Sequence, residues 1–357
     1  MTAIKPKIVI YLGLLIVLSI ATVVFFMWGA DRVPISEITA ADGDTILIGS
    51  QLIRLANIDA PELGQVAVDL NTKRYDIGEI SHAKLKEVLS EYIDVLCVAV
   101  KSDDATDIKK DEYFATCDGR FNGQKEDIGK RMVLEGMATG MYGDSAQTYA
   151  AAQQQAQLLN SGVWGKYQTW HPYDYRKAME SARDNELFVE LGVDTSAAKI
   201  KVIDGDSLEL KAKKVRLAGV DAPELGQLGY VGSAFEDFMN SYDVGIKTRD
   251  ALKNAIYSDH RYLFLECEIR QPKAAIVRDM DPGETTIATC YGLTPDSRED
   301  IAQWLVASGM AWSVAQQYRD SEDIARGLAR NIWDRRANIR DLPWTYRKKY
   351  KENNERF

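Results

Sequence analysis

The sequence predicts an α+β protein that is mainly β: two tandem barrels with packed helices, behind one N-terminal transmembrane helix. An internal repeat predicts the two barrels. Residues 42–65 read DGDTILIGSQLIRLANIDAPELGQ, and residues 204–227 read DGDSLELKAKKVRLAGVDAPELGQ, aligned without a gap. The segment 8–30 predicts the transmembrane helix, because it carries no charged residue over 23 positions.

The N-terminal segment is long enough to be a membrane anchor. At about 1.5 Å per residue, 8–30 spans a hydrocarbon core of about 30 Å, and Lys5 and Lys7 precede it on the side expected to stay cytoplasmic. A cleaved signal peptide would have a shorter apolar core and small residues before the cleavage site, whereas 27–29 read Met-Trp-Gly. We therefore expect residues 1–32 to be a cytoplasmic stub and an uncleaved signal anchor. The bulk of the chain then lies outside the cytoplasm, in a periplasmic or extracellular space.

The overall composition is that of a globular protein of about two domains, with 46% hydrophobic and 27% charged residues in 357 positions. The net charge of −9 disfavours general binding to nucleic acid, because such binding depends on Lys and Arg displacing counterions. Any nucleic-acid contact must therefore be local. The basic stretch from Arg335 to Phe357 is the obvious place, either as a solvated helix or tail or as a phosphate-binding patch.

The repeat extends well beyond the first aligned stretch. Three further blocks occur in the same order in both copies: YDIG at 75–78 and YDVG at 242–245, ATC at 115–117 and 288–290, and DIGKRMVLEGMA at 127–138 and DIAQWLVASGMA at 300–311. This period is too long for a solenoid and indicates a tandem duplication. We therefore expect a first domain at 33–165, a helical linker at 166–198, a second domain at 199–335 and a basic tail at 336–357.

Each copy is expected to begin with strands and to end with helices. The elements expected in order are hairpins at 46–48 with 52–55 and at 207–210 with 214–217, helices at 82–91 and 248–256, two strands leading to the cysteines, helices ending at Gly136 and Gly309, and closing helices at 150–159 and 324–330. This order is typical of a small Greek-key barrel with helices packed on it.

The four cysteines divide evenly between the copies. Cys97 and Cys117 lie 20 residues apart, and Cys267 and Cys290 lie 23 residues apart, at similar places in the two copies. Two disulfides of this loop length would each contribute on the order of 3 kcal/mol, and would require an oxidising compartment. The alternative is four buried free thiols. Zinc is not expected, because no pair has the C-x-x-C spacing.

These residues resemble the staphylococcal nuclease family. The resemblance rests on DGD, an arginine in an RL pair about ten residues later, DAPE, and the downstream ATC and G-x-A blocks, and it covers roughly 35–165 and 197–335. It implies a five-stranded OB barrel with three helices in each copy. It also implies a Ca²⁺-dependent phosphodiesterase that acts on DNA and RNA.

The resemblance assigns a role to each matching residue. In the first copy Asp44 and Asp59 would be metal ligands, Asp42 would support them, Glu62 would activate water and Arg54 would bind the scissile phosphate. In the second copy the same roles fall, in the same order, on Asp206, Asp221, Asp204, Glu224 and Arg216.

The residue types support this chemistry on their own. Asp44 and Asp59 are separated by a hairpin, so they can meet at one barrel end, where a hard cation takes carboxylate oxygens and the carbonyl of Ala60. An arginine fork binds two phosphate oxygens, and a glutamate orients or deprotonates water. The alternative is structural: DGD can be a tight turn, DAPE a proline-fixed turn, and Arg54 and Arg216 can pair with the aspartates to hold the barrel end together.

One departure from the family pattern concerns a second arginine, which the family places three residues before the alanine of the ATC strand. That register holds Glu112 and Thr285 here, and Lys109, Lys110 or Arg278 are the nearby candidates to replace it. Two hypotheses follow. The chain is a membrane-anchored, extracytoplasmic nuclease, or it is a degenerate pair of barrels that serves as a binding or accessory subunit of a larger membrane complex.

Overall fold

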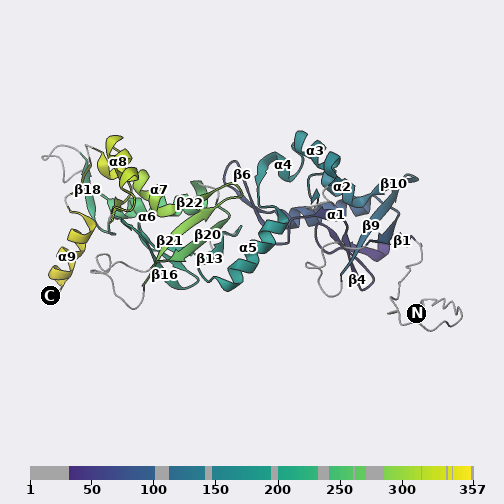
Figure 1. Cartoon of the computed structure of the whole chain (residues 1–357), viewed down its shortest axis with the longest axis horizontal. Helices are drawn as coiled ribbons and strands as arrows, with labels where there is room; N and C mark the ends of the chain where they lie inside the picture. Colours follow the sequence, from purple (N-terminus) through teal and green to yellow (C-terminus); the bar gives the residue numbers. More distant parts are fainter. Residues whose placement is uncertain are drawn as a thin grey trace, which may run out of the picture.

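The computed structural model describes residues 32–100, 112–140, 147–193, 200–231, 241–259, 262–270, 285–314, 316–334, 337–339 and 341–354. The protein is mixed α+β, and its two similar halves follow one another along the longest axis of the molecule (Figure 1). Each half is built around a seven-stranded, barrel-like sheet with helices packed on it. The prediction of two tandem, sheet-rich barrels with helices is confirmed at this level.

The main sheet of the first half has the strand order β1-β8-β9-β4-β3-β2, with β10 paired to β9. β4 and β9 run parallel, and the other neighbours are antiparallel. The strands are β1 (Val33–Pro34), β2 (Ile38–Ala40), β3 (Thr45–Ile48), β4 (Gln51–Leu55), β8 (Asp94–Ala99), β9 (Glu112–Phe121) and β10 (Gln124–Asp127). The hairpin predicted within the first DGD-to-DAPE stretch is β3 and β4.

The main sheet of the second half repeats this order as β13-β20-β21-β16-β15-β14, with β22 paired to β21. Its one parallel pair is β16 with β21, the counterpart of β4 with β9. The strands are β13 (Phe188–Glu190), β14 (Ile200–Val202), β15 (Ser207–Leu210), β16 (Lys213–Leu217), β20 (Phe264–Ile269), β21 (Thr285–Leu293) and β22 (Arg298–Asp300). The second predicted hairpin is therefore confirmed as β15 and β16.

The helices also recur in both halves. The first half contains α1 (Ile77–Ser90), α2 (Ile128–Leu134), α3 (Ala150–Leu158), α4 (Val163–Lys166) and α5 (Pro172–Asp184). The second contains α6 (Val244–Asn254), α7 (Ile301–Ala307), α8 (Arg319–Gly327) and α9 (Pro343–Asn354). The described residues also include two short 3-10 helices, η1 (Ile35–Glu37) and η5 (Asn331–Trp333), and a π-helical segment, η4 (Ala255–Asp259). As predicted, Gly136 and Gly309 follow the ends of α2 and α7, and both have positive φ.

Aspartate caps explain where four of these helices begin. The caps are Asp76, Asp127, Asp243 and Asp300, and each side chain accepts the backbone N–H three residues later. Such a cap is worth about 1 kcal/mol. The capping aspartates of the YDIG and YDVG blocks start α1 and α6 earlier than the predicted 82–91 and 248–256.

Each half has its own hydrophobic core between the sheet and the helices. Buried members in the first half include Ile46, Leu55, Leu85 and Met132, and those in the second include Leu208, Leu217, Leu252 and Leu305. The predicted disulfides are confirmed. Cys97–Cys117 joins directly opposed positions of β8 and β9, and Cys267–Cys290 does the same for β20 and β21.

A strand and a helix follow the barrel helices in each half. β12 (Tyr167–Gln168) joins β6 (Val66–Asp69) and β7 (Arg74–Asp76) and leads into α5. β24 (Ala337–Ile339) joins β18 (Leu228–Val231) and β19 (Ser241–Asp243) and leads towards α9. Two-stranded pairs β5 (Ile58–Asp59) with β11 (Thr139–Gly140) and β17 (Val220–Asp221) with β23 (Trp312–Ser313) complete the sheets. The segments predicted as a linker and a tail thus contain equivalent strand–helix units.

The two halves meet through an apolar cluster on α5. Tyr175 and Ala178 of α5 pack with Phe264 and Leu293 of the second half. Arg74 is buried beside them and donates to the carbonyl oxygens of Leu191 and Tyr262, at 3.0 and 2.6 Å. The junction is therefore closed by both apolar packing and a buried arginine.

The predicted membrane anchor at 8–30 lies outside the described residues. Among the residues that are described, no helix combines the length and the apolar character needed to cross a bilayer.

Candidate active site

The DGD turn places a buried carboxylate at one end of the first barrel. The Asp42 carboxylate accepts the backbone N–H of Asp44 at 3.0 Å, which is the contact expected of a tight turn. The buried Asp44 carboxylate accepts the Thr45 hydroxyl through Oδ1, at 3.0 Å, and the Ala60 N–H through Oδ2, at 2.8 Å. Asp44 therefore ties β3 to the DAPE segment.

Arg54 lies between the two aspartates. It stands on β4 directly opposite Thr45, and its Nη2 donates to Asp59 Oδ1 at 2.9 Å while lying 3.5 Å from Asp44 Oδ2. The charge of Asp44 raises the pKa of Arg54, against burial, which lowers it. The predicted convergence of these three side chains is thus present, and its centre is a guanidinium group.

The DAPE loop holds Glu62 beside this cluster. Its backbone N–H donates to Gln65 Oε1 at 3.1 Å, so the loop closes on its own glutamine. The first turn of α1 passes so close that a Cβ at Gly78 would lie 1.8 Å from the Glu62 carbonyl oxygen. Only glycine fits this approach, which gives the YDIG block a direct structural role at the site.

An arginine from outside the barrel completes the cluster. Arg176 of α5 donates through Nη1 to Asp59 Oδ1, at 2.8 Å, and to Glu62 Oε1, at 2.7 Å. Its Nη2 donates to Asp59 Oδ2 at 3.2 Å. One guanidinium group therefore bridges the expected metal ligand and the expected base.

The second copy reproduces this arrangement. Arg216 Nη2 donates to Asp206 Oδ2 and Asp221 Oδ1, at 2.9 and 2.8 Å. Arg347 of α9 binds both Asp221 oxygens at 2.8 Å each and also donates to Glu224. The supporting contacts recur as well: Asp204 accepts the N–H of Asp206, and Asp206 accepts the Ser207 hydroxyl and the Ala222 N–H.

Burial sets the protonation of these groups. It raises the pKa of Asp44 to about 8 and that of Asp206 to about 7, although Arg54 and Arg216 act in the opposite direction. Burial also raises the pKa of Glu224, opposed by Arg347. For Arg347 itself burial lowers the pKa, but the bonds to Asp221 and Glu224 outweigh it and raise the pKa. The arginines remain charged, whereas the pKa values of Asp44 and Asp206 are raised towards neutral pH.

The carboxylates as arranged do not fit Ca²⁺, which needs six to eight oxygen ligands. Both oxygens of Asp44 accept fixed donors, and both oxygens of Asp59 accept arginine N–H groups. Over the described parts of the chain, no three His, Cys, Asp or Glu side chains are grouped so as to hold a metal ion.

The carboxylates and the arginine predicted from the sequence lie together in each half. The second arginine of each site, Arg176 or Arg347, comes from a helix outside the barrel. Lys109, Lys110 and Arg278 lie outside the described residues, and so does the side chain of Glu112. The sequence does not single out either arginine. Arg176 lies in the segment interpreted as a linker, and Arg347 lies in the basic stretch from Arg335 to Phe357, for which phosphate binding is one of two alternatives. A signal for them exists: PYDYRK at 172–177 matches PWTYRK at 343–348, which extends the repeat by one more block.

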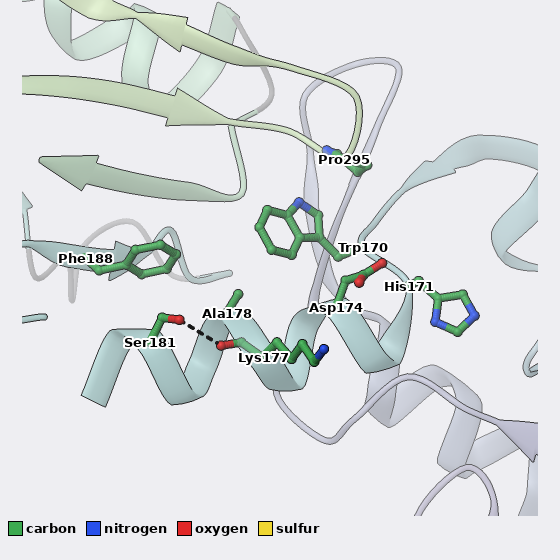
Figure 2. Close-up of a pocket in the computed structure, with 8 residues that line it drawn as sticks. All are labelled: Trp170, His171, Asp174, Lys177, Ala178, Ser181, Phe188 and Pro295. Atoms are coloured by element: carbon green, nitrogen blue, oxygen red, sulfur yellow. Dashed lines mark hydrogen bonds between the residues drawn. The ribbon is translucent and has the colours of Figure 1, made fainter. Parts of the chain in front are cut away.

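A cavity of about 440 Å³ lies beside the start of α5 (Figure 2), and its lining residue His171 lies 3.9 Å from Asp59 Oδ2. Its lining includes Trp170, Asp174 and Lys177 around the start of α5, and Pro295 from the second half. His171 also lines it and bonds through Nε2 with the Thr139 hydroxyl at 2.8 Å. Because one wall comes from the second half, the two sites have different surroundings.

No family profile matches the chain. The chain is similar to the succinoglycan biosynthesis protein ExoI of Rhizobium meliloti (strain 1021). The two are 29% identical over 136 residues, which make up 38% of this chain and 67% of that protein.

Proposed function

We propose that the chain is a membrane-anchored, extracytoplasmic pair of nuclease-like OB domains that binds and hydrolyses phosphodiesters of nucleic acid. One observation carries the proposal. In each half, two arginines from different elements converge with a buried aspartate and a glutamate at the same barrel end. Such a set combines phosphate-binding cations with a carboxylate able to act on water.

The two arginines would bind phosphate at different depths in the barrel end. Arg54 is fixed by Asp59 and lies deep in the barrel end, with only 10% of its side chain exposed. Arg176 is more exposed, at 21%, and lies nearer the solvent. The oxygens of a phosphodiester that approaches from solvent would replace the carboxylate oxygens of Asp59 and Glu62 on Arg176. The planar guanidinium group would then contact two phosphate oxygens at once.

Glu62 would then act on the attacking water. Its side chain is 29% exposed, and Arg176 binds only one of its oxygens in the described contacts. When the phosphate takes over Arg176, the carboxylate is released to accept a proton from water as the oxygen attacks phosphorus. The phosphorus–oxygen bond of the leaving alcohol breaks, and that alcohol takes a proton from solvent. Ca²⁺ stays a prediction of the resemblance and has no part in these steps.

The test is cleavage of single-stranded and duplex oligonucleotides by the detergent-solubilised full chain. The double variants Asp59→Ala with Asp221→Ala, and Glu62→Gln with Glu224→Gln, should lose on the order of 10²-fold or more in rate. Glu87→Gln on α1 is the matched control, since this exposed glutamate pairs only with Lys84 among the described contacts. Equal activity in wild type and both double variants would contradict hydrolysis at these sites.

A second candidate is an accessory subunit of a membrane complex without turnover. The fully paired oxygens of Asp59 and Asp221 favour it, as does a relative whose name concerns polysaccharide biosynthesis rather than nucleic acid. Gentle extraction from membranes followed by sizing is the test. A lone monomer with no co-purifying partner would count against this candidate.

A further inference from the structure

We propose that Arg176 and Arg347 replace a divalent cation: each guanidinium group is a built-in cation on the carboxylates to which the family resemblance assigns Ca²⁺. The inference concerns what the sites bind. It therefore stands whether or not the sites cleave a phosphodiester.

Arg176 occupies the position that a cation bound by Asp59 and Glu62 would take. Arg176 Nη1 bridges Asp59 Oδ1 and Glu62 Oε1, at 2.8 and 2.7 Å, and Nη2 takes Asp59 Oδ2 at 3.2 Å. Asp59 Oδ1 already accepts both Arg54 and Arg176, and Oδ2 accepts Arg176 again. A cation that used Asp59 as a ligand would lie in contact with the positive charge of Arg176, so cation binding requires that Arg176 leave its site.

Asp44, the other expected metal ligand, is also held in place. Asp44 cannot simply turn to a cation, because its Oδ2 accepts the backbone N–H of Ala60 at 2.8 Å. That donor is fixed in a buried segment and would lose its partner, at a cost of about 1–3 kcal/mol. Asp206 is held in the same way by Ala222, at 2.9 Å.

The chain builds this contact twice, in different surroundings. α5 packs against the second half through Tyr175 and Ala178, whereas α9 lies at the far end of the second half (Figure 1). The arginine reaches its aspartate and glutamate in both places. Docking of the two halves therefore does not by itself produce the contact.

Each arginine-bearing helix, α5 and α9, has a dedicated support. Gln65 Nε2 donates to the carbonyl of Trp170, just before α5, at 2.7 Å, and Gln227 Nε2 donates to the carbonyl of Asp341, just before α9, at 2.6 Å. Both glutamines are almost completely buried. Each one closes the DAPE loop and fixes the start of the arginine-bearing helix, so the guanidinium group is positioned by the same motif that supplies the carboxylates.

Calorimetric titration of Ca²⁺ into the metal-free, detergent-solubilised full chain tests the inference. Wild type should take up no Ca²⁺ at these sites below about 1 mM, the weak end of protein Ca²⁺ sites. Arg176→Gln with Arg347→Gln should tighten Ca²⁺ binding on the order of tenfold, because two carboxylates in each site lose their cation. Lys348→Gln is the matched control for the second site, since it removes the same charge from the next, exposed position after Arg347 and should change nothing.

A second measurement uses inorganic phosphate as the probe. Wild type should bind phosphate equally well in Ca²⁺ and in chelator, and the arginine variant should lose this binding while the lysine variant retains it. Submillimolar Ca²⁺ binding by wild type would overturn the inference, as would an arginine variant that binds Ca²⁺ no better than the lysine variant. If the arginine variant fails to fold, the wild-type titrations with Ca²⁺ and with chelator decide alone. A wild type that passes both tests but cleaves nothing would refute the nuclease and leave this inference intact.

Discussion

The side-chain amide of Gln65 donates to the backbone carbonyl of Trp170 across a separation of 105 residues, at 2.7 Å. The same amide also donates to the Thr169 hydroxyl, at 3.0 Å, while its oxygen accepts the N–H of Glu62. The last residue of DAPELGQ therefore connects the candidate base to the helix that carries Arg176. The motif therefore does more than supply the candidate site residues, because it also encodes the docking of α5.

Gln65→Ala should release α5 from the barrel. The substitution leaves the Trp170 carbonyl and the Glu62 N–H without their partner, which should cost about 2–3 kcal/mol in the free energy of unfolding. Chemical denaturation measures this loss, and limited trypsin digestion should show faster cleavage after Arg176. Gln157→Ala, at an exposed position of α3, is the control. Cleavage after Arg176 at the wild-type rate would show that Gln65 does not hold the helix.

Gly78→Ala should displace the DAPE loop. A Cβ there would lie 1.8 Å from the Glu62 carbonyl oxygen, and one at Gly245 would lie 2.0 Å from that of Glu224. Because both contacts involve backbone, the cost should be about 3 kcal/mol in each half, and Glu62 should move away from Arg176. Thermal unfolding measures the effect. Gly327→Ala is the control, since nothing lies within 4 Å of its Cβ position; equal melting temperatures for the variants at 78 and 327 would refute the predicted clash.

The sequence predicts the barrel hairpins and the site carboxylates well because both depend on local patterns. The run from Ile46 to Ile48, a Gly-Ser turn and the run to Leu55 specify β3 and β4 without help from distant residues. Gly136 likewise ends its helix through its own backbone conformation. The disulfides follow from the recurrence of cysteine pairs.

Distant partners decide what the sequence could not show. β6 and β7 are short and acquire their third strand only when Tyr167 and Gln168 return to them. In α9 the surrounding lysines are typical of a solvated helix, and only the position of Arg347 beside Asp221 separates a site residue from its neighbours. The charge of a side chain is visible in sequence, but its direction on a helix depends on what the helix packs against.

Arg74→Met should weaken the junction between the halves. The buried guanidinium group donates to the carbonyls of Leu191 and Tyr262, at 3.0 and 2.6 Å, and methionine would leave both acceptors unpaired. We expect a loss of about 2–4 kcal/mol, and unfolding by guanidinium chloride should divide into two transitions. Lys73→Met, at the exposed neighbouring position, should leave the curve unchanged. A single transition at the wild-type midpoint would show that Arg74 does not couple the halves.

His171 should report the charge of Arg176. Burial lowers the pKa of His171 from its ordinary value of 6.5, Asp59 raises it, and Arg176 lowers it further. NMR titration of the imidazole signal, assigned with His171→Asn, should therefore give a pKa below 6.5 in wild type. Arg176→Gln should raise this pKa, whereas Lys177→Gln should have a smaller effect because Lys177 is not among the groups that shift it.

The same shift sets the sign of a pH effect on stability. A base whose pKa is lower in the folded state binds fewer protons when the protein is folded, so acidification favours the unfolded state. The contribution of His171 to the free energy of unfolding is therefore complete above pH 6.5 and is lost as pH falls through the folded pKa. The melting temperature should therefore fall on acidification below pH 6.5, and His171→Asn should remove that part of the fall. If Arg176→Gln leaves the imidazole pKa unchanged, the guanidinium group does not lie beside His171 and Asp59 in solution, and the built-in cation would fail with it.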